Sequence, residues 1–146
     1  GIKSKKEIDD IFRVRKELEG LAASLAAKNI SQKQIEKLNH YTEQIKDCIR
    51  DDDLKKCIQI DISFHDIIKG ASDNQWLEKD LDNLFEQITR FRAKSLGQKG
   101  RMEQALKEHK QLGQAIATGD SELAEKLARE HIEEAWKSVL AVFDNK

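Results

Sequence analysis

The sequence of 146 residues contains no proline, only seven glycines and a single tyrosine. Proline is the residue that most strongly interrupts a helix, so a chain without it is free to form long helices. Stretches that alternate between apolar and polar residues, as β-strands do, are also scarce. No apolar run approaches the roughly 18 residues of a membrane-spanning helix, so we expect neither a membrane span nor a signal peptide.

The sequence also lacks an excess of charge of either sign and has few cysteines. Its 26 lysine and arginine residues nearly balance 27 aspartate and glutamate residues. Because nucleic-acid-binding surfaces cluster basic residues on one face, this balance gives no support to DNA binding by this segment. Two cysteines, Cys48 and Cys57, are too few for a disulfide framework, which favours a reducing cytoplasm.

What the sequence has in abundance is alanine, leucine, glutamate and lysine, with apolar residues recurring at helical spacing. We therefore predict an all-α fold, an antiparallel bundle of about six helices that forms a single domain over residues 1–146, with a metal or ligand site in its interior. Capping and helix-breaking residues mark the limits of the expected helices. The first covers about 5–28, and the second extends from 31 to the acidic residues 51–53. The third extends from these acidic residues to about 70, the fourth from about 74 through 91, the fifth over about 101–118, and the sixth from 120 through 143.

Asp61 and His65 are four residues apart, which places them on the same side of one predicted helix. That side is apolar, because Ile58, Ile62 and Ile68 lie on or beside it. An ionisable pair that points into a core costs several kcal/mol unless something satisfies it, and a metal ion is one such partner. We therefore interpret this pair as half of a metal site.

Two further histidines, His109 and His131, lie among apolar neighbours and are expected to face inward, whereas His40 lies among charged residues and is assigned to solvent. His109 precedes the turn at Gly119 by ten residues, and His131 follows that turn at a similar distance. At about 1.5 Å per residue both lie roughly 15–17 Å from the turn, so the two rings are expected side by side.

One carboxylate and three imidazoles thus meet in the predicted interior. We predict that Asp61, His65, His109 and His131 bind one divalent metal ion. Imidazole suits zinc and nickel, and the carboxylate adds manganese as an alternative. In the competing interpretation each histidine is a lone core residue bonded to a backbone carbonyl. Cys57 lies one turn before Asp61 as a further ligand candidate, although a buried, apolar cysteine is the favoured interpretation.

Arg15 is expected to face the interior from the first helix, because its helical neighbours include Phe12 and Leu18. It either pairs with Glu19 or forms a bidentate clamp for a carboxylate ligand bound beside the metal. Arg92 is a weaker candidate of the same kind.

Asn74 is the third candidate for contact with an effector, but the favoured interpretation of this residue is a helix N-cap. Trp76 and Trp136 lie on apolar stripes and are predicted to belong to the core rather than to a binding surface. The candidate effector-binding residues are therefore Arg15, Asn74 and Arg92.

Several short motifs follow one another along most of the chain. They are Arg15-x-x-Leu18-Glu19, Asp61-x-x-Phe64-His65, Ala71-Ser72-Asp73-Asn74, Glu108-His109, Ala115-Ile116-x-x-Gly119-Asp120 and a final His131. In this order and spacing the sequence resembles the FCD domain, the C-terminal effector-binding domain of the FadR-type branch of GntR-family bacterial transcription regulators. The resemblance implies that Asp61, His65, His109 and His131 bind a divalent metal, and that a small carboxylate effector completes the coordination near Arg15.

The resemblance also implies a homodimer, with DNA bound only through a separate N-terminal winged helix-turn-helix domain. This sequence shows no such domain, and we expect that it was removed or was never present. The leading hypothesis is a cytoplasmic, non-enzymatic sensor in which effector binding repositions attached DNA-binding domains. The alternatives are a metal-dependent hydrolase, for which the chain offers no inward general base beyond the metal ligands, and a plain structural bundle.

Overall fold

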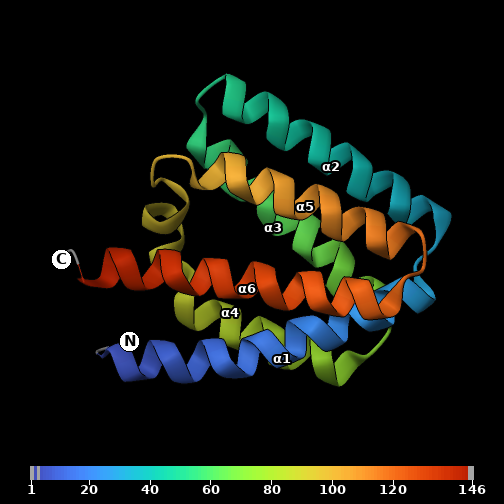
Figure 1. Ribbon diagram of the computed structural model, residues 1–146, viewed down its shortest axis with the longest axis horizontal. Helices are drawn as coiled ribbons and strands as arrows, with labels where there is room; N and C mark the ends of the chain where they lie inside the picture. Colours follow the sequence, from blue (N-terminus) through green and yellow to red (C-terminus); the bar gives the residue numbers. More distant parts are fainter. Residues whose placement is uncertain (1, 3, 145–146) are drawn as a thin grey trace.

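The computed structural model describes residues 2 and 4–144, so the ends of the predicted domain at 1, 3 and 145–146 lie outside the described residues. Six helices joined by short connections make up the described part, which contains no strand (Figure 1). They are α1 (Lys5–Asn29), α2 (Gln32–Arg50), α3 (Leu54–Ala71), α4 (Gln75–Leu96), α5 (Arg101–Ala117) and α6 (Ser121–Asp144). The predicted all-α fold is confirmed, and each predicted helix corresponds to an observed one.

Polar side chains at the helix starts explain these boundaries. The predicted capping box opens α2: Ser31 Oγ accepts from the backbone N–H of Gln34 at 3.2 Å, and Gln34 Oε1 accepts from that of Ser31 at 2.9 Å. Asp53, Asn74 and Asp120 each accept a hydrogen bond from the backbone N–H three residues later, at the starts of α3, α4 and α6. Each bond satisfies one of the amide groups that the start of a helix leaves without a partner.

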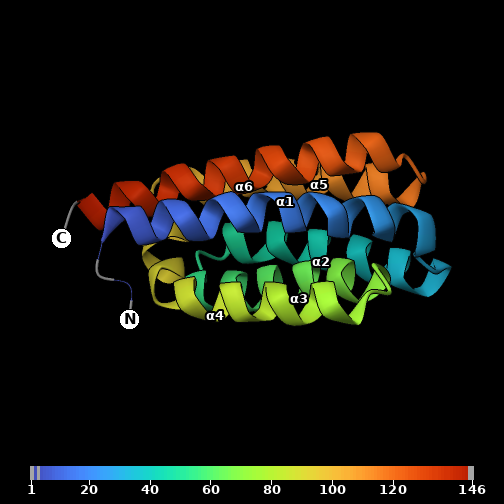
Figure 2. The same cartoon turned by 90° about the horizontal axis from the view of Figure 1, so that it is seen from below.

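Successive helices run in opposite directions, so α1 begins and α6 ends at the same end of the molecule (Figures 1 and 2). Figure 2 shows α5 and α6 on one side and α3 and α4 on the other, with α1 and α2 between them. The most extensive packing of α1 is against α6, and α1 also contacts α3, α4 and α5. This central position allows side chains of α1 to reach the interior that the other helices enclose.

The interior consists of apolar clusters separated by a layer of polar residues. One cluster surrounds Phe64, and another surrounds Phe12. Both α1 and α6 contribute to the two clusters, α1 on either side of Arg15 and α6 on either side of His131. Buried polar residues therefore occupy the level at which one apolar cluster ends and the next begins, held between elements that are already packed.

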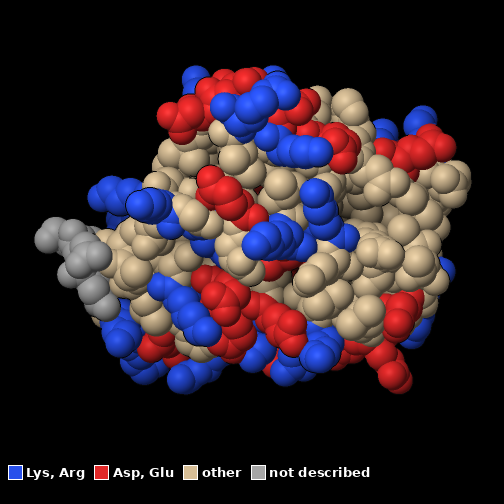
Figure 3. Space-filling model, turned by 45° about the horizontal axis from the view of Figure 1, so that its top comes forward, with Lys and Arg blue, Asp and Glu red and all other residues tan. Residues whose placement is uncertain are grey.

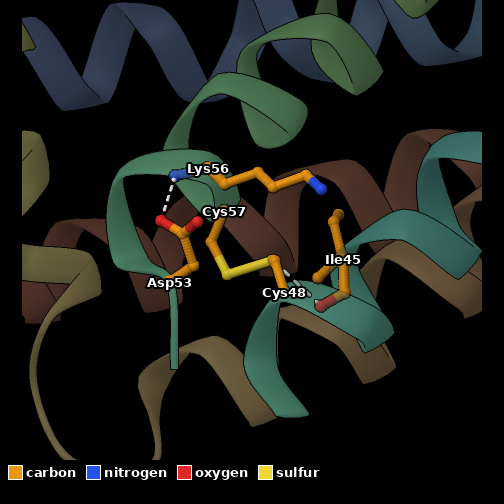
Figure 4. The surroundings of a disulfide bond; sticks show 5 residues. All are labelled: Ile45, Cys48, Asp53, Lys56 and Cys57. Carbon is orange, nitrogen blue, oxygen red and sulfur yellow. Dashed lines mark hydrogen bonds between the residues drawn. A yellow bond between two sulfur atoms is a disulfide. The ribbon is translucent and has the colours of Figure 1, made fainter. Parts of the chain in front are cut away.

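Cys48 and Cys57 form a disulfide that ties the end of α2 to the beginning of α3 (Figure 4). Their Cα atoms lie 5.6 Å apart because the turn reverses the chain tightly, with the backbone N–H of Asp53 donating to the carbonyl of Cys48 at 3.0 Å. Both cysteines are buried. Cys57 is thus buried, as favoured, but its sulfur is bonded to that of Cys48, so its candidate role as a metal ligand is wrong. The cysteine count therefore no longer supports the expected reducing cytoplasm. A count of cysteines does not show that a turn brings two of them together.

The two tryptophans differ in their surroundings. Trp136 packs on Phe12 with ring centroids 6.0 Å apart, and its Nε1–H donates to Asp9 Oδ1 at 2.8 Å. Trp76 is 78% exposed, so the prediction that it belongs to the core is wrong. It precedes the buried Leu77 at the start of α4, and one step along a helix turns the side chain by about 100°, which carries Trp76 away from the packed face.

Lysine and arginine residues are interspersed with aspartate and glutamate on the face drawn in Figure 3. Some of these charges pair between helices, such as Arg129 of α6 with Glu17 of α1 at 2.8 Å. That face therefore presents no broad basic surface for nucleic acid. Within the described part of the chain, no helix combines the length and the apolar character that a bilayer crossing requires.

Candidate metal and effector site

The four residues predicted as metal ligands come together in the interior: Asp61 and His65 from α3, His109 from α5 and His131 from α6. One nitrogen of each histidine lies within 4.8 Å of those of the other two. His109 Nε2 is 3.3 Å from His65 Nε2 and 3.0 Å from Asp61 Oδ1. His65 Nε2 is 3.4 Å from the same oxygen. His109 is fully buried, and Asp61 and His131 are buried beside it.

The surroundings of these rings are not those of three separate core histidines. Among the described residues, none of the three rings donates a hydrogen bond to a backbone carbonyl. His65 and His109 face each other through their Nε2 atoms, and His109 Nδ1 is buried without a hydrogen-bond partner. Two ring nitrogens and one carboxylate oxygen form a triangle of electron-pair donors, which a cation satisfies.

The ionisation states of the site follow from burial and from neighbouring charges. Burial lowers the pKa of His65 to about 4 against the opposing effect of Asp61, and burial lowers that of His131 to about 4 against its hydrogen bond with Glu108. Burial alone would raise the pKa of Asp61, but Arg92 and then His65 hold it well below its usual range. At neutral pH the rings of His65 and His131 are therefore neutral and the carboxyl group of Asp61 is ionised, which are the forms that coordinate metal ions.

Glu108 also belongs to this site, although no role was predicted for it from the sequence. Its Oε1 lies 2.6 Å from Nδ1 of His131, and its two oxygens accept from Nη1 and Nη2 of Arg101 at 3.0 and 3.2 Å. Burial alone would raise the pKa of Glu108, but the bonds from His131 and Arg101 lower it to about 2. Because His131 is neutral, its ring donates the Nδ1–H to the ionised Glu108 and keeps the lone pair on Nε2 for a ligand.

One sequence signal could have pointed to this pair. Arg101 and Glu108 are seven residues apart, which is about two helical turns, and they therefore lie on the same face of α5. Glu108 also directly precedes His109. Charged residues commonly lie on one face of a helix because that face is exposed to solvent, so the spacing alone did not distinguish this buried pair from a solvated one.

Three arginines line a cavity of about 40 Å³ beside the histidines. Arg15, Arg92 and Arg101 form its walls together with Asp61, His65, His131 and a set of apolar side chains that includes Phe12, Ile88, Leu96 and Val139. Arg92 donates through Nη2 to Asp61 Oδ2, the oxygen that does not contact the histidines, and its guanidinium lies 4.3 Å from the ring centroid of Phe85. The structure thus brings the predicted effector residues Arg15 and Arg92 next to the predicted metal ligands.

Arg15 is 6% exposed, as its helical neighbours predicted. Its Nη2 lies 3.9 Å from Glu19 Oε2, which is close enough for an ion pair but too far for a hydrogen bond. Burial lowers the pKa of the Arg15 guanidinium, and Glu19 offsets this effect in part. Arg15 therefore faces the cavity with a single loosely held counter-charge on its own helix.

Asn74 and His40 lie away from the histidine cluster. The side chain of Asn74 accepts from the backbone N–H of Leu77 at 3.1 Å, which is the N-cap that the sequence favoured, and Asn74 is not among the residues that line the cavity. Contact between Asn74 and an effector stays a prediction. His40 is exposed on α2, as expected for a residue without a role in the site.

A helical bundle that encloses a cluster of imidazoles and carboxylates beside an arginine-lined cavity has a concave site with a few convergent polar groups, as sites for small ligands do. The family model of the FCD domain matches residues 10–134 of the chain. The chain belongs to the FCD domain family, which confirms the resemblance seen in the sequence motifs.

Relatives of known name agree with this assignment. The chain is 25% identical over 126 residues to the HTH-type transcriptional repressor RspR of Escherichia coli (strain K12), and equally to the HTH-type transcriptional regulator YdfH of Shigella flexneri. These alignments cover 86% of the chain and 55% of each relative, so the chain spans about half the length of its curated relatives.

Solved structures share the fold. The E. coli protein McbR/YncC superimposes with a TM-score of 0.86 at 19% identity, over 96% of this chain and 67% of that chain. Streptococcus agalactiae GntR superimposes with a TM-score of 0.79 at 23% identity, over 94% of this chain and 62% of that chain. At these identities the similarity establishes the helical architecture of the domain.

Proposed function

We propose that this chain is the effector-sensing domain of a GntR-family transcription regulator, and that it binds one divalent metal ion through Asp61, His65, His109 and His131. The observation that carries the proposal is the triangle formed by His65 Nε2, His109 Nε2 and Asp61 Oδ1, with sides of 3.0, 3.3 and 3.4 Å. Two ligands that are each about 2.1 Å from one ion lie about 3.0 Å apart at a right angle and about 3.4 Å apart at a tetrahedral angle. The triangle therefore has the size of a set of ligands to one ion.

Nitrogen and oxygen ligands of this kind favour zinc or nickel, with manganese as the alternative. The bond between His131 and Glu108 supports a metal site as well, because histidines that bind metals commonly donate their other N–H to a carboxylate. A metal bound by four protein ligands in octahedral geometry keeps two positions open, and these positions are where an effector can coordinate.

We propose further that the effector is a small organic carboxylate held by Arg15 and Arg92. A carboxylate can place one oxygen on the metal and the other on the guanidinium of Arg15, whose present counter-charge, Glu19, is 3.9 Å away. Arg92 orients Asp61 through Oδ2 and lines the same cavity. An effector bound in this way contacts α1, α3 and α4 at once, so it can favour one packing of these helices over another.

This binding site fits a sensor better than an enzyme. Glu19 and Glu108, the partly buried carboxylates nearest the site, are each paired with an arginine, so among the described residues neither is free to act as a general base for a metal-bound water. The curated relatives carry the names of transcriptional regulators. We therefore propose a cytoplasmic homodimer that controls transcription through a separate DNA-binding domain. Effector binding would reposition the DNA-binding domains that are attached to the sensing domains.

The metal is tested by measuring the metal content of the chain purified without added metal. We expect about one divalent ion per chain in the wild type and in His40→Ala, whose side chain is exposed, and little in His131→Ala. Metal present at 100 times its Kd contributes about 2.7 kcal/mol, so a chelator should lower the melting temperature of the first two proteins by roughly 5–10 °C and leave His131→Ala nearly unchanged. Equal metal retention in His40→Ala and His131→Ala would rule the site out.

A further inference from the structure

The charges around the cavity balance before any metal is bound. Three arginines and three carboxylates in or beside the cavity are buried or mostly buried, and each carboxylate lies within ion-pair distance of one of the arginines: Arg15 with Glu19, Arg92 with Asp61, and Arg101 with Glu108. A histidine coordinates a metal ion as the neutral imidazole, so the three rings add no charge to this balance when a metal is bound. A divalent ion therefore adds two positive charges that no described side chain of the cavity compensates, in an interior where unpaired charge is costly.

Two buried donors in the same place also have no acceptor. The Nε atoms of Arg92 and Arg101 are buried without a hydrogen-bond partner, although Nη2 of Arg92 bonds to Asp61 and both Nη atoms of Arg101 bond to Glu108. Buried N–H groups are nearly always paired in folded proteins. Arg101 is 8% exposed, and both arginines line the cavity that also contains Arg15.

From these two observations we infer that the effector is a small dianion, specifically a dicarboxylate. This inference rests on the proposed function, since it assumes the metal and a carboxylate beside it. One carboxylate group binds the metal and Arg15, and the other offers acceptors to the Nε–H groups of Arg92 and Arg101. The dianion then compensates both charges of the metal. A monocarboxylate compensates only one of them and leaves the two Nε–H groups without a partner.

The size and the walls of the cavity limit this ligand. A volume of about 40 Å³ holds about three water molecules. The walls between the arginines are apolar, with Phe12, Ile88 and Val139 among them. A dicarboxylate of three or four carbons, with methylene groups between its two charged ends, matches these walls. It has seven or eight non-hydrogen atoms, so the side chains around the cavity must move apart to admit it, and the small volume favours the shortest members of the class.

The test compares ligands of equal carbon number on the metal-loaded chain by isothermal titration calorimetry at pH 7. Malonate and succinate are the dicarboxylates, and propionate and butyrate are their monocarboxylate controls. We expect each dicarboxylate to bind at least tenfold more tightly than its control, and only when metal is present. The metal content is measured again after each titration, because a dicarboxylate that merely extracts the ion would overturn the inference.

Conservative variants test the contact itself. Arg101→Lys keeps a cation opposite Glu108 but lacks the Nε–H, and Arg92→Lys does the same opposite Asp61. In variants that still carry one metal per chain, we expect the preference for succinate over butyrate to fall at least fivefold. The matched control is Arg13→Lys, an exposed arginine of α1 that should leave the preference unchanged.

The two levels of the proposal fail differently. If the chain binds no metal, or if no carboxylate of either class binds in a metal-dependent way, the proposed function is wrong and the inference falls with it. If butyrate and succinate both require metal but bind within threefold of each other, only the dianion is wrong. An unchanged succinate preference in both Arg101→Lys and Arg92→Lys would also overturn it.

Discussion

The Nδ1–H of His131 has a single acceptor, Glu108, and both oxygens of Glu108 are held by Arg101. This chain of bonds begins at the first residue of α5 and ends on α6. It fixes the tautomer of His131 and the rotation of its ring, so that the Nε2 lone pair is available before a metal arrives. Such outer partners commonly set how tightly a metal is bound, although they do not touch it.

Replacing this acceptor should weaken metal binding without changing the number of sites. Glu108→Gln keeps the shape of the side chain but removes its charge, and we expect the metal Kd to rise roughly 10- to 100-fold. Competition with a coloured chelator of known affinity measures this change. Glu103→Gln, at an exposed acidic position of the same helix, serves as the control. The same Kd in both variants would show that Glu108 has no part in the site.

The four predicted ligands could be found from the sequence, because the side of a helix on which a residue lies follows from its neighbours three and four positions away. Glu108 could not be assigned in this way. Its partner His131 is on the next helix, and the contact depends on how α5 and α6 are rotated against each other. Cys57 was misjudged for a similar reason, since its bond to Cys48 depends on the shape of a turn.

At the scale of the helices, two bonds cross the turn between α2 and α3: a disulfide and a backbone hydrogen bond. The disulfide joins Cys48 to Cys57 (Figure 4). The backbone N–H of Asp53 donates to the carbonyl of Cys48 at 3.0 Å and closes the same turn. Cys57 lies one helical turn before Asp61, so the disulfide anchors the end of α3 from which a candidate metal ligand extends.

Reduction of this disulfide should lower the stability of the chain. The loop that it closes is short, with a sequence separation of 9 residues. Chain entropy for such a loop predicts a loss of roughly 2–3 kcal/mol, measured as a lower midpoint in urea unfolding with a thiol reductant. The double variant Cys48→Ala/Cys57→Ala should be insensitive to the reductant. Identical midpoints for the oxidised and the reduced wild type would contradict the prediction.

The limits of the helices were predictable because caps are local. Ser31, Asp53, Asn74 and Asp120 each bond to a backbone amide three residues away, so both partners are visible in one short stretch of sequence. The exposure of Trp76 also has a local cause, because Trp76 lies one helical step of about 100° from Leu77, which is buried with Leu81 on the packed face of α4. Which of two adjacent apolar residues faces the core is decided by the packing of α4, so the sequence alone left this choice open.

For the molecule as a whole, the antiparallel order of the helices was predictable from their short connections. The extensive packing of α1 on α6 was not, because it joins the two ends of the sequence. That packing places Arg15 of α1 and His131 of α6 at the same level, between the cluster around Phe64 and the cluster around Phe12. The fold thus buries ionisable groups in the middle of its core, and its stability should depend on pH.

Without metal, the chain should become less stable as the pH falls from about 6.5 to about 4. His65 and His131 titrate near pH 6.5 when unfolded. In the fold burial lowers both pKa values to about 4, so in this interval the unfolded chain binds more protons. Each histidine should lower the free energy of unfolding by on the order of 3 kcal/mol across the full interval.

Urea unfolding of the metal-free chain at pH 7.5, 6.0 and 5.0 measures the loss. His131→Ala should lose about half as much as the wild type, and His40→Ala, whose ring is exposed, as much as the wild type. Equal losses in His131→Ala and the wild type would mean that the buried ring of His131 does not resist protonation.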